Sequence, residues 1–206
     1  MAARQGGTRV RIMDIAQEAI LAKGFDATSI DEIVAAAEIT KGGFFYHFPD
    51  KAALARALIE RYIAEDDALF DGLIARARDL SDDPLQTALI TLKLLAEVLD
   101  DMEDGHPGCL VATFAYQDRL FDRDVHEMNK RGVEGWRERF EALFAEVAAV
   151  YPPRDAVDME ALADMVTCAV EGGIVLQKAF RDPKAAAKQV LLVRSYVKLL
   201  FTPSRH

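Results

Sequence analysis

Hydrophobic and polar residues recur along this chain with a period of about 3.6 residues, which is the period of an α-helix. Ile12, Ala16 and Ile20 show the pattern, because residues four positions apart lie on one helical face. Runs of β-branched residues with a period of two, which are typical of strands, are missing. The pattern predicts an all-α fold of about nine helices.

Residues that cap or interrupt helices indicate where these segments begin and end. Gly24 suits the left-handed position after a first helix, and Thr28 or Ser29 offers an oxygen to the amides of the next. Thr40 and Asp155 are further candidate caps. We expect helices over residues 8–23, 28–37, 40–47, 51–77, 84–102, 109–117, 122–150, 155–180 and 182–201.

The lengths of these helices change near residue 50. The segments after the first helix and before this point are short, whereas those beyond it, apart from residues 109–117, are long. We therefore expect two domains, residues 1–50 and residues 51–206.

The predicted helices at residues 28–37 and 40–47 form a candidate helix-turn-helix. A short connection makes two helices cross steeply, so that one can lie over a sugar-phosphate backbone while the other enters the major groove. Gly42 and Gly43 each cost about 1 kcal/mol in a helix relative to alanine, but they would permit close approach to a phosphate or a base edge. A frayed helix end explains the spacing equally well, and both interpretations stay open at this point.

Cationic, aromatic and hydrogen-bonding side chains gather in the second of these helices. Lys41, Tyr46 and His47 are of the kind that contacts phosphates and base edges. A charge cluster is ordinarily a solvated face, yet a surface rarely carries so many aromatic residues without a core or a partner. We assign Phe44 and Phe48 to packing against the first helix, and Tyr46 and His47 to the outward face.

The net charge of the chain is −9, which taken alone argues against nucleic acid as a partner. The charge is unevenly distributed, however, because Arg4, Arg9 and Arg11 precede the first acid and most acidic residues follow residue 51. Hydrophobic residues make up 51% of the chain, which is enough for a substantial core. The overall charge therefore does not decide the partner.

No segment has the character of a membrane span or of a signal peptide. The longest stretch without Asp, Glu, Lys or Arg is residues 105–117, well short of the roughly 20 residues that cross a bilayer. We therefore expect a cytoplasmic protein with no membrane partner. Cys109 and Cys168 lack CxxC spacing, so we expect neither a disulfide framework nor a zinc site.

Three stretches carry a resemblance to a known family. They are Gly24 to Ile30 (GFDATSI), Ile33 to Phe48 (IVAAAEITKGGFFYHF) and Lys51 to Leu54 (KAAL). Over about residues 8–55, the chain resembles the DNA-binding domain of TetR-family transcriptional regulators. The resemblance is specific as a composite, since it combines a Thr, the Thr-Lys-Gly start of a recognition helix, its aromatic-His-Phe end and a trailing Lys at the family's spacing.

This resemblance implies that residues 1–50 bind DNA and that residues 51–206 bind a ligand and form a dimer. Glu38 stands where the family usually has Gly, so we expect a costly left-handed turn there. Phe45 stands where Tyr is common, so we expect one phosphate hydrogen bond to be missing. The positions that match the family's DNA contacts are Thr28, Thr40, Lys41, Gly42, Gly43, Phe45, Tyr46, His47 and Lys51.

The last two predicted helices are apolar on more than one face, which indicates contacts on several sides. A thick monomer core is one explanation. We prefer a homodimer in which these helices from two chains form a four-helix bundle, because two-fold symmetry also suits a palindromic DNA site. The expected interface residues are Leu162, Val166, Ala169, Gly173, Leu176, Val193 and Val197.

The resemblance also implies a mainly apolar pocket for a small-molecule effector. Taken singly, each aromatic or Met candidate is better explained as ordinary core, and Glu171 suits an interhelical hydrogen bond at least as well. We expect no cofactor and no metal, since the acidic loop at residues 100–104 lacks EF-hand spacing. The candidate lining residues are Tyr62, Met102, Phe114, Tyr116, Trp136, Phe140 and Glu171.

Together these features predict a homodimeric DNA-binding regulator. Among regulators, they favour a ligand-responsive repressor that binds a palindromic operator. An enzyme using His106, Glu171 or a cysteine is one alternative, but the chain contains no catalytic motif. The better alternative is a ligand-binding or scaffold protein with a weakened DNA-reading head, which Glu38 and Phe45 favour.

Overall fold

A computed structural model describes the backbone of residues 2–202 and the side chains from residue 7 onward. Within this part the chain forms nine α-helices, one 3-10 helix and no strand, which confirms the predicted all-α fold. None of these helices combines the length and the apolar character that a membrane span requires. The side chain of Arg4, part of the basic start of the chain, lies outside the described residues.

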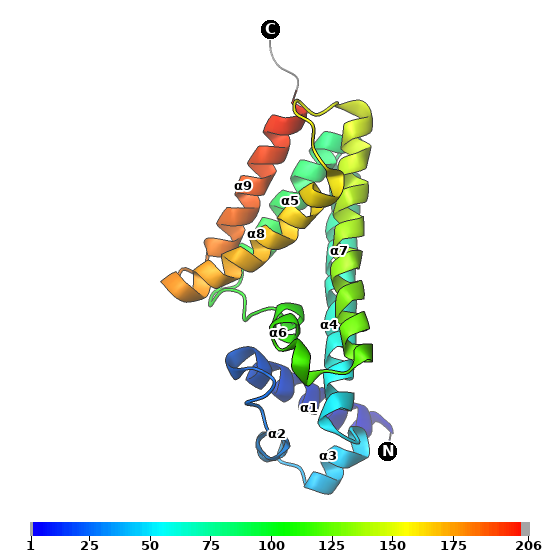
Figure 1. The fold of residues 1–206 in the computed structure, drawn as a ribbon, viewed down its shortest axis with the longest axis vertical. Coiled ribbons are helices and arrows are strands. Elements are labelled where there is room, and N and C mark those ends of the chain that lie inside the picture. Colours follow the sequence, from blue (N-terminus) through cyan, green and yellow to red (C-terminus); the bar gives the residue numbers. More distant parts are fainter. Residues whose placement is uncertain (1, 203–206) are drawn as a thin grey trace. The chain divides into compact units, whose positions relative to one another are not determined.

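The helices group into two compact units (Figure 1). The first unit contains the chain up to residue 65 together with residues 107–133, and the second contains residues 66–106 and the chain from residue 134. Both boundaries within helices fall in the two longest ones, α4 (Lys51–Leu80) and α7 (Arg123–Val150). The remaining elements of the first unit are α1 (Ala2–Lys23), α2 (Ile30–Ala36), α3 (Lys41–His47), α6 (Leu110–Tyr116) and η1 (Asp118–Leu120). Those of the second are α5 (Pro84–Asp100), α8 (Met159–Phe180) and α9 (Ala185–Phe201).

Residues 107–133 pack with the N-terminal helices, which the sequence did not indicate. Figure 1 shows α6 beside α1, and the two helices are in contact. Compact grouping does not reveal which segment folds alone, so the division at residue 50 stays a prediction.

Helix ends follow the capping chemistry of the sequence. Ser29, and not Thr28, caps α2 by accepting a hydrogen bond from the Glu32 amide, and Thr40 caps α3 by accepting one from the Gly43 amide. The cap of α8 is Asp158, three residues later than predicted. Each oxygen satisfies an amide that has no partner within its helix, which stabilises the helix by about 1 kcal/mol.

A continuous apolar core holds the first unit together. Phe44 and Phe48 are buried, as predicted, and the guanidinium of Arg9 on α1 lies 5.0 Å from the centre of the Phe48 ring. Burying a side chain of this size stabilises the fold by about 1.5–3 kcal/mol. Other fully buried residues are Ile12, Ile20, Ile33, Leu54 and Leu58.

In the second unit α9 packs against both α5 and α8. Gly173 makes the approach of α8 to α9 possible, because a Cβ at this position would collide with the backbone of Ala186. Gly173, which the sequence placed at the dimer interface, is therefore approached by a helix of the same chain. Gly172 has open space around it.

Candidate nucleic-acid interface

The turn between α2 and α3 contains a residue in the left-handed region. Glu38 has φ 51°, and its amide donates to the Ala35 carbonyl. This conformation favours glycine, since a Cβ crowds the backbone there. The departure from the family's usual Gly therefore leaves a strained residue at the turn that orients α3.

The outward face of α3 consists of the residues that the resemblance matched to DNA contacts. Phe45 and Tyr46 are 47% and 70% exposed, which is unusual for side chains of their size. His47 is half-buried, and its ring packs edge-on against Tyr46. The remaining members, Thr40, Lys41 and Gly42 exposed and Gly43 half-buried, lie at the start of the helix. All seven are therefore displayed by a single short helix whose other face holds it in the core.

The two glycines of α3 are not required by the packing of the chain itself. A Cβ on Gly42 would meet only the hydroxyl oxygen of Thr40, at 3.8 Å. A Cβ on Gly43 would come within 3.4 Å of the same oxygen. Glycine destabilises a helix relative to alanine, so two glycines at positions that would accept a Cβ indicate a surface shaped for a close external approach.

Charged residues around this face are paired. Lys41 forms a 2.7 Å ion pair with Asp31 of α2, and both side chains are well exposed. Lys23 donates a 2.6 Å hydrogen bond to Glu32, which lowers the pKa of that carboxyl group. Exposed pairs of this kind contribute little stability, so Lys41 can exchange Asp31 for a phosphate at small cost.

Thr28 and Lys51 lie differently from the other predicted contact residues. Thr28 is fully buried, and its hydroxyl donates to the Gly24 carbonyl at 2.9 Å. The Lys51 ammonium donates to the Phe25 carbonyl and lies 4.1 Å from the centre of the Phe25 ring. Burial lowers the pKa of Lys51. Both side chains are engaged within the chain, and their contact with DNA stays a prediction.

Phe25 is the point at which the rest of the first unit holds the helix-turn-helix. The Gln117 side chain accepts a 2.8 Å hydrogen bond from its amide, and Lys51 binds its carbonyl. Its ring packs against Phe121 and Phe114, with centroid distances of 4.7 and 5.8 Å. We call these five residues the Phe25 junction. Sequence reasoning missed this junction, because Phe114, Gln117 and Phe121 lie some 90 positions from Phe25 and carry no motif.

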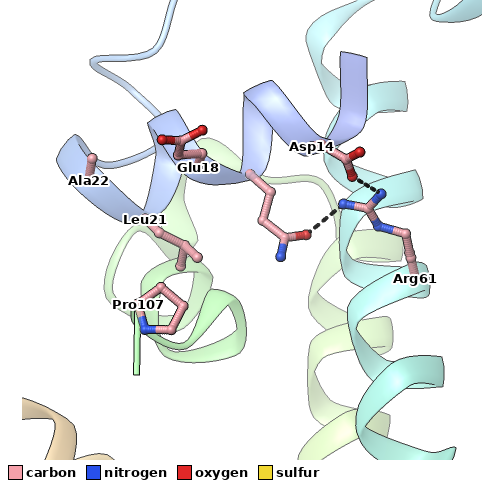
Figure 2. Close-up of a pocket in the computed structure, with 7 residues that line it drawn as sticks. Asp14, Glu18, Leu21, Ala22, Arg61 and Pro107 are labelled. Atoms are coloured by element: carbon pink, nitrogen blue, oxygen red, sulfur yellow. Dashed lines mark hydrogen bonds and ion pairs between the residues drawn. The ribbon is translucent and has the colours of Figure 1, made fainter. Parts of the chain in front are cut away.

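Arg61 of α4 makes a second connection to α1 (Figure 2). Its guanidinium donates to Asp14 at 2.6 Å and to Gln17 at 2.9 Å. These residues border an open pocket of about 390 Å³ whose wall includes Leu21, Ala22 and Pro107. The two hydrogen bonds of Arg61 fix α1 relative to α4.

The predicted effector residues are divided between the two units. Tyr62, Phe114 and Tyr116 belong to the first, and Met102, Trp136, Phe140 and Glu171 to the second. Tyr116 is 86% exposed and so does not line an interior pocket in this structure. Trp136 and Phe140 are buried around Phe70, as ordinary core aromatics would be.

Five of the seven predicted dimer residues are buried inside the chain. We expected these residues to cover a partner chain. Four of them are at most 6% exposed within the single chain, and Gly173 lies against α9 of the same chain. The residues concerned are Leu162, Val166, Gly173, Val193 and Val197. Ala169 and Leu176 are half-buried. The apolar character of these helices is thus used largely for packing within the protomer.

The backbone of His106 and the side chain of Asp100 make contacts within the second unit. The Gln177 amide group binds both the amide and the carbonyl of His106, at 3.0 and 2.9 Å. Asp100 pairs with Lys184. Residues 7–202 contain no cluster of His, Cys, Asp or Glu suited to a metal ion.

An exposed short helix, presented after a left-handed turn and backed by a core, defines a helix-turn-helix DNA-binding protein. The family described as "Bacterial regulatory proteins, tetR family" matches residues 12–58. Transcriptional regulator AcuR of Cereibacter sphaeroides is 28% identical over 169 residues, which cover 78% of this chain and 72% of the relative. HTH-type transcriptional repressor DhaR of a Mycobacterium species is 23% identical, with 84% of each chain covered.

Solved structures of TetR-family regulators have the same fold as this chain. Regulatory protein TetR from Rhodobacter sphaeroides superposes with a TM-score of 0.71 at 26% identity, covering 90% of this chain and 96% of that one. A TetR transcriptional regulator from Chloroflexus aurantiacus shares the fold, with a TM-score of 0.77 at 20% identity over 96% and 98% of the two chains. The chain belongs to the TetR family of transcriptional regulators and is a DNA-binding regulator, not an enzyme.

Proposed function

We propose that this protein is a cytoplasmic transcriptional repressor that binds a palindromic operator as a homodimer. In this proposal α3 enters the major groove, where Tyr46 and His47 contact base edges and Lys41 contacts a phosphate. The observation that carries it is the open outward face of α3, with glycines that the chain's own packing does not need. The relative DhaR is a transcriptional repressor, which supports this direction of regulation.

The dimer is proposed to form through the outward faces of α8 and α9. Leu192, Tyr196 and Leu199 are 63%, 45% and 63% exposed, and their spacing of four and three places them on one face of α9. Val175 and Phe180 of α8 are 60% and 74% exposed. We call these five residues the α8–α9 apolar face. A second copy of the chain suits it, because a palindrome requires two-fold symmetry.

Regulation is proposed to depend on a small, mainly apolar effector. The effector must bind the DNA-released conformation more tightly than the DNA-bound one, because equal affinity for both would shift nothing. By reciprocity, operator DNA then weakens effector binding by the same factor that the effector weakens DNA binding. Helix α4 begins beside the Phe25 junction at Lys51 and continues into the second unit, so it is the proposed connection.

Fluorescence anisotropy tests the central proposal. Labelled DNA from the region upstream of the gene is titrated with protein at fixed physiological salt, beside a scrambled duplex of equal length. Selective binding with two protomers per site supports the repressor. If both duplexes bind weakly and equally, the protein is next offered a random DNA library. Failure to select any preferred sequence from that library would contradict the proposal.

A second candidate function is a ligand-binding protein whose DNA-reading head is weakened. The strained, exposed Glu38 favours it, since its carboxylate lies in the turn that precedes α3. Replacing Glu38 by Gly separates the two functions. Restored selectivity in the variant, with none in the natural chain, would support the weakened head.

A further inference from the structure

A cleft of about 310 Å³ lies within the first unit, between α6, η1 and the start of α7. Its walls are mainly apolar and include Phe114, Phe121, Val125 and Val133. A cavity of roughly 150 Å³ already accepts benzene, so this cleft has room for a compact molecule with two rings. Apolar walls of this kind favour an uncharged ligand, because a buried ion would lose its hydration.

The charged residues of the cleft are exposed to solvent. The imidazole of His126 pairs with the backbone carbonyl of Asp118 at 2.7 Å, and both residues are exposed. Lys130, which also lines the cleft, is exposed as well. Water screens charges at such positions, so the apolar wall is the more distinctive feature of the site.

Asn129, which lines the cleft, has one polar atom without a partner. The Asn129 amide nitrogen donates to the Val111 carbonyl at 3.1 Å, and since a carbonyl only accepts, this fixes the orientation of the amide group. The Asn129 Oδ1 atom is screened from water, and no group among residues 7–202 donates to it. A buried acceptor without a donor is costly. A ligand hydroxyl that displaces the wall slightly would supply the missing hydrogen bond.

The same wall belongs to the Phe25 junction. Phe114 and Phe121 stack at 4.2 Å, and both rings contact Phe25. Phe25 lies directly before the helix-turn-helix, and its amide is held by Gln117 of the segment that follows α6. A ligand that moves Phe121 therefore acts on the position from which the reading head is held.

We propose that this cleft is an effector site inside the DNA-reading unit, and that it takes a compact, uncharged ring compound with one hydrogen-bond donor. Its occupation shifts Phe114 and Phe121 against Phe25 and weakens operator binding. Ligand binding in this cleft does not depend on the proposed function, whereas the effect of the ligand on DNA binding rests on it.

Calorimetry with two matched probes tests the site on the full chain without DNA. The probes are 1-naphthol and 1-methoxynaphthalene, which differ in that only the naphthol can donate a hydrogen bond. We expect naphthol to bind about tenfold more tightly. In Asn129→Ala the two affinities become equal, whereas a purely structural role of Asn129 would weaken both probes by the same factor. Equal affinities in the natural protein would overturn the proposal.

A variant that fills the cleft tests whether the probes bind there. Val133→Trp should abolish binding of both probes, while Ala145→Trp, at an exposed position further along α7, should leave it unchanged. Thermal unfolding of both variants checks that each is folded. Binding that survives in a folded Val133→Trp protein would place the ligand elsewhere and overturn the site.

The effect on the reading head has a readout that does not need DNA. Naphthol should increase hydrogen exchange at the Phe25 amide, which Gln117 protects in the free protein. It should also lower operator affinity in the natural chain but not in Val133→Trp. Faster exchange without any operator binding would refute the proposed function while supporting the site. If hydrogen exchange at the Phe25 amide is unchanged when naphthol is bound, the coupling between the cleft and the Phe25 junction is refuted.

Discussion

The outward face of α3 and the α8–α9 apolar face are both exposed, yet they differ in chemistry. The first combines two glycines, a lysine, a tyrosine and a histidine on a helix of seven residues. The second combines Leu192, Tyr196 and Leu199 of α9, a helix of 17 residues, with Val175 and Phe180 of α8. Polar groups with room for close approach suit a nucleic acid, whereas large apolar side chains suit another protein surface.

This difference also explains which of the two faces could be predicted residue by residue. On α3, the polar groups of Lys41 and Tyr46 mark outward positions, because burying them would cost their hydration, whereas the apolar Phe44 is inside. On α8 and α9 the buried and exposed positions carry the same types of residue, such as Val193 and Leu192. Composition alone therefore cannot tell which apolar residue packs inside the protomer and which one faces a partner.

The largest effect is expected from a charge on the α8–α9 apolar face. Leu192→Glu should convert the dimer into monomers, because a carboxylate at the centre of an apolar interface loses its hydration. Operator affinity should then fall by about 100-fold, since each head binds alone. Sedimentation velocity and anisotropy measure the two results.

Ala145→Glu is the matched control for this substitution. It adds the same charge at an exposed helical position of the second unit, so mass and affinity should stay unchanged. A dimeric Leu192→Glu protein would show that the face is not the interface.

A smaller loss is expected from Gly42→Ala. The methyl group has room in the free protein, so helix stability should rise by about 1 kcal/mol, while operator affinity falls by about tenfold because close approach is blocked. Gly72→Ala on α4 is the control, since Gly72 also has open space around it. It should stabilise the protein without affecting DNA binding. Equal DNA affinity in both variants would remove Gly42 from the interface.

Lys41→Ala should weaken binding to operator and to random DNA by a similar factor of about five, and lower the salt slope by about one. The reason is the loss of one phosphate contact. Lys93→Ala removes a comparably exposed lysine that pairs with Glu97 in the second unit, and it should leave the slope unchanged. Anisotropy titrations over a series of salt concentrations measure both. A slope that Lys41→Ala does not alter would exclude the contact.

The smallest effect concerns the turn before α3. Glu38→Gly relieves the left-handed strain and should raise the free energy of unfolding by about 0.5–1 kcal/mol. Glu38→Gln removes the same charge but keeps the strain, so it should leave stability nearly unchanged. Both should bind DNA a few-fold more tightly, since each removes a carboxylate near phosphates. Chemical unfolding separates strain from charge, and a Gln variant as stable as the Gly variant would contradict the strain.

Much of the fold followed from the sequence because helices depend on local pattern. The predicted start of α3 at Thr40 and its end at His47 match the structure, since capping and periodicity act over a few residues. The start of α8 was misplaced, because Asp155 and Asp158 are equally good caps and only packing selects between them.

The sequence by itself determined the helical segments and the Thr40 cap of α3, since these depend on neighbours within one or two turns. Only the tertiary structure decided the Phe25 junction, where Gln117, Phe114 and Phe121 reach a residue some 90 positions away. It likewise decided that Lys51 holds Phe25, and that Val193 and Val197 are interior. The physical reason is that side-chain chemistry fixes what a residue can bind, whereas packing fixes which partner lies within reach.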